Sequence, residues 1–206
     1  MPPGVKRPTF PRATRRGAAR AVLGCAVVFW GVAGGPRAAR AAGEQEWQLA
    51  ARTGTATVNA DGRTSWGFAA GLDVEYGLTD AWAVRASGAT SLHSVAPEMR
   101  MDPRPSGKIV TAAGLAGLTY TIDILRLVPY GDFQLGAYRL SGAVTKPTTL
   151  FVAAIGIGAD FYLTRRWTAG AYFQYLFSPV DLFSDPFNLG SNPYQFSATI
   201  KLSRIF

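Results

Sequence analysis

The segment at residues 194–203 alternates strictly between apolar and polar side chains. Its apolar set is Tyr194, Phe196, Ala198, Ile200 and Leu202, and its polar set is Gln195, Ser197, Thr199, Lys201 and Ser203. A period of two over about ten residues places the two sets on opposite faces of a β-strand. A strand of that length, with one apolar and one polar face, spans a bilayer when it is tilted. The alternative is an edge strand of a soluble sandwich.

The formal charge of +8 is confined to the start of the chain. Eight basic residues and no acidic residue precede residue 42, which leaves 13 basic and 13 acidic residues in the remainder. The basic residues of this segment are Lys6, Arg7, Arg12, Arg15, Arg16, Arg20, Arg37 and Arg40. A neutral remainder argues against a nucleic-acid partner, which would need a basic surface.

The first 41 residues have the parts of a secretory signal peptide. A basic stretch ends at Arg20, an apolar run covers residues 21–33, and Ala39-Arg40-Ala41 offers a cleavage site. The apolar run is too short to span a membrane as a helix. Its Cys25 loosely resembles the cysteine of a lipoprotein box, but the run continues past it. We expect cleavage after Ala41, with residues 1–41 as the leader and 42–206 as one folded domain without cysteine.

The two-residue period of the last segment recurs seven times before it. The predicted strands are residues 47–57, 65–76, 81–92, 108–122, 129–141, 150–163, 167–177 and 194–206. The connections after the even-numbered strands are short, and those after the odd-numbered strands are longer, less so after the first and fifth. Short turns on one rim and longer loops on the other are typical of transmembrane barrels. The sequence therefore predicts an all-β fold, an eight-stranded antiparallel up-and-down transmembrane β-barrel that follows a signal peptide.

Two short turns repeat one pattern. Tyr76-Gly-Leu-Thr-Asp-Ala-Trp82 aligns with Phe161-Tyr-Leu-Thr-Arg-Arg-Trp167, and this pattern resembles the turns of small OmpA-like and OmpW-like outer-membrane barrels. In that superfamily a terminal Phe, here Phe206, is read by the barrel-assembly machinery, although Arg204 stands where an apolar residue is usual. The resemblance implies a monomer in the bacterial outer membrane. Its implied partners are outer-membrane lipids, the assembly machinery and periplasmic chaperones.

Aromatic residues cluster near the strand ends on the predicted lipid-facing side. Tyr and Trp favour the membrane–water boundary because one end of the ring is apolar and the other is polar. The predicted aromatic girdle comprises Trp47, Trp66, Tyr76, Trp82, Tyr120, Phe161, Trp167, Phe173, Tyr175 and Phe177. A lipocalin-like soluble barrel would turn these rows inward, but the opposite faces combine Gly and Ala with charges.

Seven charged residues fall on the inward faces. They are Arg52, Arg85 and Lys201 against Asp73, Glu75, Asp132 and Asp160. Because three positive charges nearly balance four negative ones and isolated buried charges are costly, we expect these residues to form ion pairs in the narrow lumen. We expect an ion-pair plug in the periplasmic half with Arg85 at its centre. Centring the turn on Thr79 pairs Asp73 with Arg85 and Tyr76 with Trp82. The upper lumen is then left with Gly, Ser, Thr, Gln and Tyr138.

No motif indicates catalysis, a cofactor or a metal. His93 is the only histidine, and the adjacent Ser94 points to the opposite face, so we expect a solvated loop histidine. Gly156-Ile157-Gly158 lies inside a predicted strand and is interpreted as packing in a narrow lumen, not as a nucleotide loop.

The superfamily includes anchors, adhesins, small-solute channels and a few lipid-modifying enzymes. We expect a structural or surface-interaction protein with a plugged lumen, with a narrow channel for small or hydrophobic solutes as the alternative and a lipid-modifying enzyme as a weaker one.

Overall fold

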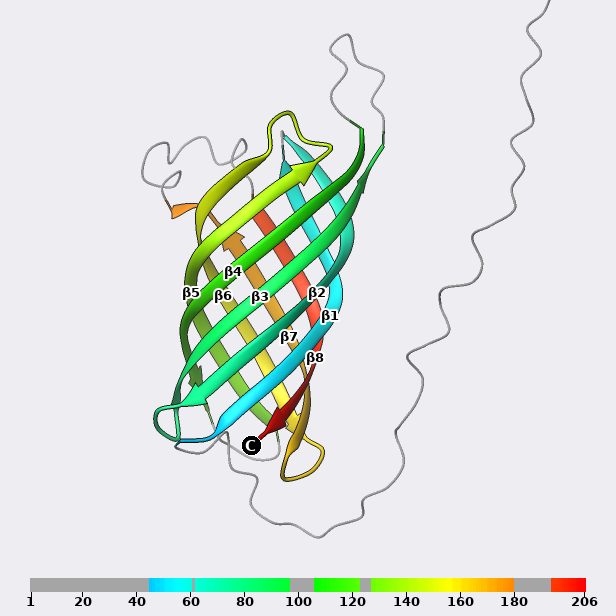
Figure 1. Ribbon diagram of the computed structural model, residues 1–206. Helices are drawn as coiled ribbons and strands as arrows, with labels where there is room; N and C mark the ends of the chain where they lie inside the picture. Colours follow the sequence, from blue (N-terminus) through cyan, green and yellow to red (C-terminus); the bar gives the residue numbers. More distant parts are fainter. Residues whose placement is uncertain (1–44, 61, 97–105, 123–126, 180–193) are drawn as a thin grey trace, which may run out of the picture. The chain divides into compact units, whose positions relative to one another are not determined.

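The computed structural model describes residues 45–60, 62–96, 106–122, 127–179 and 194–206. The predicted leader lies outside these residues. Figure 1 shows the strands wound into a closed barrel in chain order. The strands are β1 (Trp47–Ala60), β2 (Arg63–Gly77), β3 (Trp82–Val95), β4 (Gly107–Thr121), β5 (Leu127–Gly142), β6 (Thr148–Tyr162), β7 (Trp167–Phe177) and β8 (Tyr194–Ile205). The predicted eight-stranded antiparallel barrel is confirmed.

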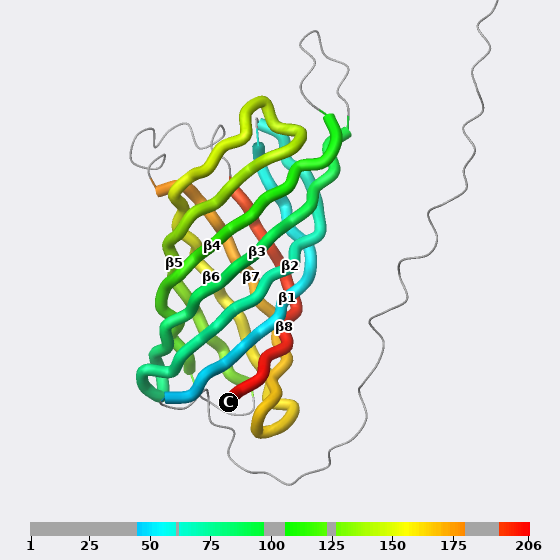
Figure 2. The backbone as a smooth tube through the Cα atoms, viewed as in Figure 1, coloured from blue at the N-terminus to red at the C-terminus, as the bar shows by residue number. Residues whose placement is uncertain are grey.

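The closing seam pairs the first strand with the last. β8 runs antiparallel to β1 from Gln48 opposite Ile205 to Asn59 opposite Tyr194, and Figure 2 shows the two strands side by side. Exposure alternates along β8: the inward Lys201 is 3 % exposed, whereas the outward Ile200 is 68 % exposed. Apolar side chains therefore face outward and polar side chains face inward, the reverse of a soluble barrel.

Most strands are longer than a membrane requires. β1, β3 and β5 contain 14, 14 and 16 residues, whereas about 9–11 tilted residues cross the hydrocarbon core. The extra residues lie mainly at the rim opposite the two termini of the barrel, so β1 reaches Ala60 and β3 reaches Val95. Only residues 61–62 connect β1 to β2. The prediction of a longer connection there was wrong, because both strands continue almost to their turn.

The two turns with the repeated pattern share one geometry. Leu78 and Leu163 each donate a backbone N–H to the carbonyl of Trp82 or Trp167, at 2.8 and 3.0 Å. In both turns the threonine hydroxyl accepts backbone N–H groups from the last turn residue and from the tryptophan. The repeated Leu-Thr-x-x-Trp pattern therefore encodes a four-residue turn between strands.

This turn sets a register that differs from the predicted one. Glu75 lies opposite Arg85, and Tyr76 lies opposite Val84. The predicted pairs of Asp73 with Arg85 and of Tyr76 with Trp82 were wrong by two residues, because the turn centres on Asp80 instead of Thr79. Among the described residues, no helix is long and apolar enough to cross a membrane.

The outer end of the barrel interior is apolar. Its buried members, here called the outer apolar cluster, include Val58, Val95, Ile109, Leu140, Val144, Val152 and Leu176. The expectation of an upper lumen lined only by Gly, Ser, Thr, Gln and Tyr138 was wrong. Val58 and Val95 lie on strand ends beyond the predicted ones, whereas Ile109, Leu140, Val152 and Leu176 lie on the inward faces of strands that were predicted.

Candidate functional site: the barrel lumen

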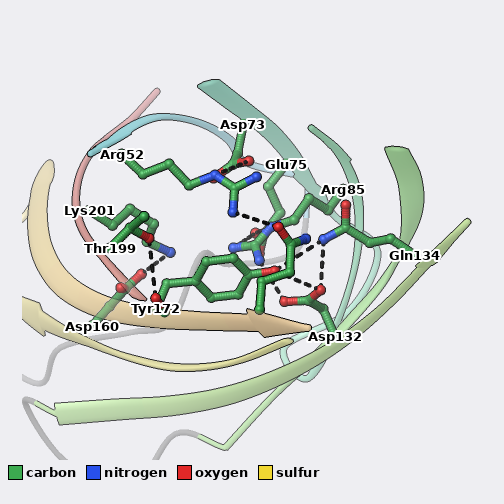
Figure 3. Close-up of polar contacts among 11 residues, drawn as sticks. Arg52, Asp73, Glu75, Arg85, Asp132, Gln134, Asp160, Tyr172, Thr199 and Lys201 are labelled. Atoms are coloured by element: carbon green, nitrogen blue, oxygen red, sulfur yellow. Dashed lines mark hydrogen bonds and ion pairs between the residues drawn. The ribbon is translucent and has the colours of Figure 1, made fainter. Parts of the chain in front are cut away.

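All seven predicted lumen charges lie inside the barrel. Each is at most 7 % exposed. Four ion pairs join them: Arg52–Asp73, Arg85–Glu75, Arg85–Asp132 and Lys201–Asp160. Figure 3 shows these side chains converging from different strands. The alternation of side chains along each strand points these charges into the barrel, whereas the tertiary structure determines which of them form ion pairs.

Arg85 binds two carboxylates. Its Nε donates to Glu75 Oε2 at 3.0 Å, and its Nη1 donates to Asp132 Oδ2 at 2.8 Å. The guanidinium also lies over the rings of Tyr130 and Tyr172, with Cζ 5.0 and 5.3 Å from the centroids. Two ion pairs and two cation–π contacts hold this cation in the middle of the lumen.

Asp132 is bound on both oxygens. Its Oδ1 accepts Nε2 of Gln134 at 2.7 Å and the hydroxyl of Tyr172 at 3.0 Å, while Oδ2 accepts Arg85. The side chain is fully removed from solvent. Three donors compensate the buried negative charge, so Asp132 links β3, β5 and β7 through one carboxylate.

The other two cations have separate partners. Arg52 Nε lies 3.3 Å from Asp73 Oδ1, and its Nη1 donates to Gln174 Oε1 at 3.1 Å. Lys201 Nζ lies 2.6 Å from Asp160 Oδ2. Asp73 therefore pairs across the β1–β2 boundary, not with Arg85 as predicted.

Inward glycines make room for these side chains. A Cβ at Gly156 would lie 2.6 Å from Asp132 Oδ2, and a Cβ at Gly158 would meet the ring of Tyr130. Both glycines sit in β6, opposite Asp132 and Tyr130 in β5. This close packing agrees with the interpretation of Gly156-Ile157-Gly158 as lumen packing.

Two small cavities lie among the lumen side chains. A cavity of about 20 Å³ is lined by Glu75, Arg85, Tyr130, Asp160 and Lys201, among others. A second cavity of about 10 Å³ lies among Arg52, Gln174 and Thr111. A cavity needs roughly 10–15 Å³ to hold one water molecule. Each of these two cavities therefore has space for isolated water molecules.

His93 is buried in the lumen, and the expectation of a solvated loop histidine was wrong. It is 2 % exposed, its Nδ1 lies 3.2 Å from the carbonyl of Ser65, and its Nε2 lies 2.6 Å from Ser91 Oγ. Donation from Nδ1 to that carbonyl leaves Nε2 as the acceptor of the Ser91 hydroxyl. The missed signal is the alternation of Ser91, His93 and Val95, which continues the strand past the predicted end.

The histidine belongs to a polar network above the ion pairs. Ser91 Oγ contacts Thr111 Oγ1 at 2.5 Å, and Gln195 Oε1 accepts the hydroxyls of Thr111 and Tyr138 at 3.1 and 2.9 Å. Neither cavity is lined by His93 or Ser91. The network satisfies buried polar groups of several strands, and its members Thr111 and Gln195 line the second cavity, whose volume is about 10 Å³.

The predicted girdle residues face outward in two bands. Trp47, Tyr76, Trp82, Tyr120, Phe161 and Trp167 lie near the short-turn end, and Trp66, Phe173, Tyr175 and Phe177 lie farther along the strands. Ring pairs connect neighbouring strands in the first band, with centroids 4.8 Å apart for Trp47–Tyr76 and 4.9 Å apart for Trp82–Tyr120.

Phe206 lies on the outside of the barrel at the seam. Its N–H donates to the carbonyl of Trp47 at 2.9 Å, and its side chain is 63 % exposed. The guanidinium of Arg204 lies over the rings of Phe206 and Trp167, with Cζ 4.9 and 5.8 Å from the centroids. The arginine that departs from the usual terminal pattern is therefore placed between two aromatic rings.

A closed antiparallel barrel with an apolar exterior and charges packed inside defines an integral outer-membrane β-barrel protein. The profile of the outer membrane protein beta-barrel domain family matches residues 25–206, and the chain belongs to that family. The family thus indicates a location in the bacterial outer membrane. No curated protein matches the chain.

Several solved structures share the fold. Neisserial surface protein A is 14 % identical, with a TM-score of 0.57 over 78 % of this chain and 97 % of the other. OprG from Pseudomonas aeruginosa is 16 % identical, with a TM-score of 0.55 over 80 % and 98 %. Ail, the attachment invasion locus protein of Yersinia pestis, is 16 % identical, with a TM-score of 0.53 over 79 % and 99 %. At these identities the likeness extends to the fold alone.

Proposed function

We propose that this protein is a closed, non-conducting barrel that serves as a structural or surface-interaction protein of the outer membrane. The observation that carries the proposal is the position of Arg85, which is 1 % exposed and bound to carboxylates of β2 and β5. A cation held in this way crosses the lumen and obstructs it. Moving it aside would leave the carboxylates of Glu75 and Asp132 buried without the cation that pairs with them.

A second obstruction supports the same function. The outer apolar cluster fills the lumen at the end farthest from the short turns. An ion that passed the charged layer would lose its hydration among aliphatic side chains, which is unfavourable. Two obstructions of opposite chemistry favour a closed barrel over the alternative, a narrow channel for small or hydrophobic solutes.

The distribution of connections supports a surface role. The longest connections between strands follow β3 and β7. They leave the rim opposite the short turns, which is the rim that faces outward in barrels of this kind. Two neighbours in fold are named as a surface protein and an attachment invasion locus protein. We therefore assign any partner contact to the outer connections and none to the lumen.

Export and membrane integration complete the proposal. The leader is removed after Ala41, periplasmic chaperones and the barrel-assembly machinery deliver the chain, and Phe206 is the assembly signal. The two aromatic bands lie at the membrane boundaries in contact with outer-membrane lipids. We propose that the barrel acts as a monomer, since its four lumen ion pairs all form within one chain.

Planar-bilayer recording tests the closed lumen. The purified protein is expected to give no steady single-channel conductance. Arg85→Ala alone is expected to remain closed, since the outer apolar cluster is intact. Combining Arg85→Ala with Leu140→Ser and Val152→Ser should open a small conductance. Steady conductance of the parent would instead support the narrow channel.

The weaker alternative, a lipid-modifying enzyme, is tested on the same preparation. Lipid A incubated with the protein should keep its mass, because the cavity beside the Ser91–His93 pair has a volume of only about 10 Å³. Loss of an acyl chain with the parent and not with Ser91→Ala would establish the enzyme.

A further inference from the structure

Three exposed arginines lie together at one corner of the short-turn rim. Arg165 and Arg166 occupy the turn between β6 and β7, and Arg204 lies near the end of β8. Trp167 stands opposite Arg204 in the β7–β8 ladder, and the N–H of Ile205 donates to the carbonyl of Arg166 at 2.8 Å. Figure 1 shows this turn and the C-terminus at the same end of the barrel. We call Arg165, Arg166 and Arg204 the basic corner.

The charge of the basic corner is not neutralised within the described residues. None of the four lumen ion pairs includes a member of the corner. Arg204 contacts only the faces of Trp167 and Phe206 through its guanidinium. Three positive charges therefore meet the surroundings of the barrel at one place.

The fold does not require these arginines. The turn between β2 and β3 has the same hydrogen bonds and carries Asp80 and Ala81 where the β6–β7 turn carries Arg165 and Arg166. A Leu-Thr-x-x-Trp turn thus forms with an acidic and a small residue at the variable positions. The geometry of the turn therefore does not explain why residues 165 and 166 are arginine.

The neighbouring aromatics set the depth of the corner. Trp167 and Phe206 face outward and are 40 % and 63 % exposed, and aromatics at strand ends lie at the level of the lipid headgroups. Short turns face the periplasm in barrels of this kind. The three guanidinium groups are thus at the height of the phosphates of the periplasmic leaflet.

We propose that the basic corner binds the headgroup phosphate of an anionic phospholipid in the periplasmic leaflet. Guanidinium groups match phosphate oxygens with paired N–H donors, and a tryptophan face beside them packs against the glycerol and upper acyl chain. Because Asp80 and Ala81 replace the arginines at the β2–β3 turn, the site is on one side of the rim.

Native mass spectrometry of the purified protein tests the proposal. The protein is placed in nanodiscs of phosphatidylcholine and phosphatidylglycerol in equal amounts, released, and analysed for retained lipids. The test variant is Arg165→Asp with Arg166→Ala, which installs the residues of the other turn and keeps its geometry. A second variant is Arg204→Ala.

The parent should retain phosphatidylglycerol in preference to phosphatidylcholine. A basic residue near an anionic membrane surface strengthens binding about fivefold. Each arginine removed should therefore lower the preference for phosphatidylglycerol roughly fivefold. Arg139→Ala, an exposed arginine on β5 toward the other rim, serves as the matched control and should leave the preference unchanged. Equal retention by parent and test variants, or an equal loss with Arg139→Ala, would overturn the site. Folding of each variant is checked by its shift on unheated gels.

Discussion

Arg85 and Glu75 face each other directly across the β2–β3 hairpin, and the guanidinium binds Glu75 Oε2 through both Nε and Nη2 at 3.0 Å. The same guanidinium reaches Asp132 on β5. One cation therefore compensates two buried carboxylates that belong to different hairpins.

Removing Arg85 should destabilise the barrel strongly. Arg85→Ala leaves Glu75 and Asp132 buried without a cation, and the loss of one partner of a buried ion pair costs about 3–5 kcal/mol. Urea unfolding in detergent micelles measures this loss. The triple variant Arg85→Met with Glu75→Gln and Asp132→Asn should be less damaging than Arg85→Ala. If the triple variant is the less stable, the penalty does not come from stranded carboxylates.

Double-mutant cycles test the pairing of Asp73. The coupling free energy of Arg52 with Asp73 should exceed that of Arg85 with Asp73, because only the first pair is in contact, at 3.3 Å. The coupling of Arg85 with Glu75 should also exceed that of Arg85 with Asp73. A largest coupling for Arg85 with Asp73 would contradict the register of the β2–β3 hairpin.

Substitution by alanine should affect stability differently at two glycines of the β4–β5 hairpin. A Cβ at the inward Gly136 would lie 2.8 Å from the Cα of Leu115, and backbone cannot rotate away. Gly136→Ala should therefore cost about 1–3 kcal/mol of unfolding free energy. At the outward Gly114 a Cβ meets nothing within 4 Å, so Gly114→Ala should change stability by less than about 0.5 kcal/mol. Equal losses in urea unfolding would contradict the close approach of Gly136 to the backbone of β4.

Deleting Phe206 should affect assembly more than stability. Its side chain is exposed on the lipid side and fills no space in the lumen, so refolding into detergent should persist. Membrane levels in cells should fall if the terminal ring is the assembly signal. Phe206→Tyr is the conservative control and should be tolerated. Equal membrane levels of the deletion and the parent would contradict this role.

The faces of the strands were predictable because a two-residue period decides the side of every residue. Lys201 and Ile200 are neighbours in the chain, yet one is buried and the other faces lipid. All seven lumen charges followed from this rule, which depends on local geometry alone.

The ion pairs among these charges could not be predicted from the two-residue alternation. A register shift of two residues keeps every side chain on its face, so alternation cannot distinguish Asp73 from Glu75 as the residue opposite Arg85. The bond from Arg85 to Asp132 joins strands that are not neighbours. Such contacts depend on strand tilt and stagger around the whole barrel, which no single hairpin encodes.

His93 and two members of the outer apolar cluster, Val58 and Val95, were missed for a related reason. Strand ends were predicted at turn-forming residues, whereas β3 continues to Val95 and β1 to Ala60. Backbone hydrogen bonds to the adjacent strand keep the chain extended there, even where the local sequence has no strong preference for a strand.

The bonds across the lumen also bear on the order in which the chain matures. Arg52 on β1 reaches Gln174 on β7, 122 positions later, and Tyr172 on β7 reaches Asp132 on β5. Contacts between the two ends of the chain form only after a large loop has closed, so their stabilisation is gained late. A half-built sheet can form the pairs Arg52–Asp73 and Arg85–Glu75 between adjacent strands, but Asp132 and Asp160 gain their cations only from strands that are not their neighbours. Closure of the ring is thus favoured, since only the finished barrel pairs all seven lumen charges.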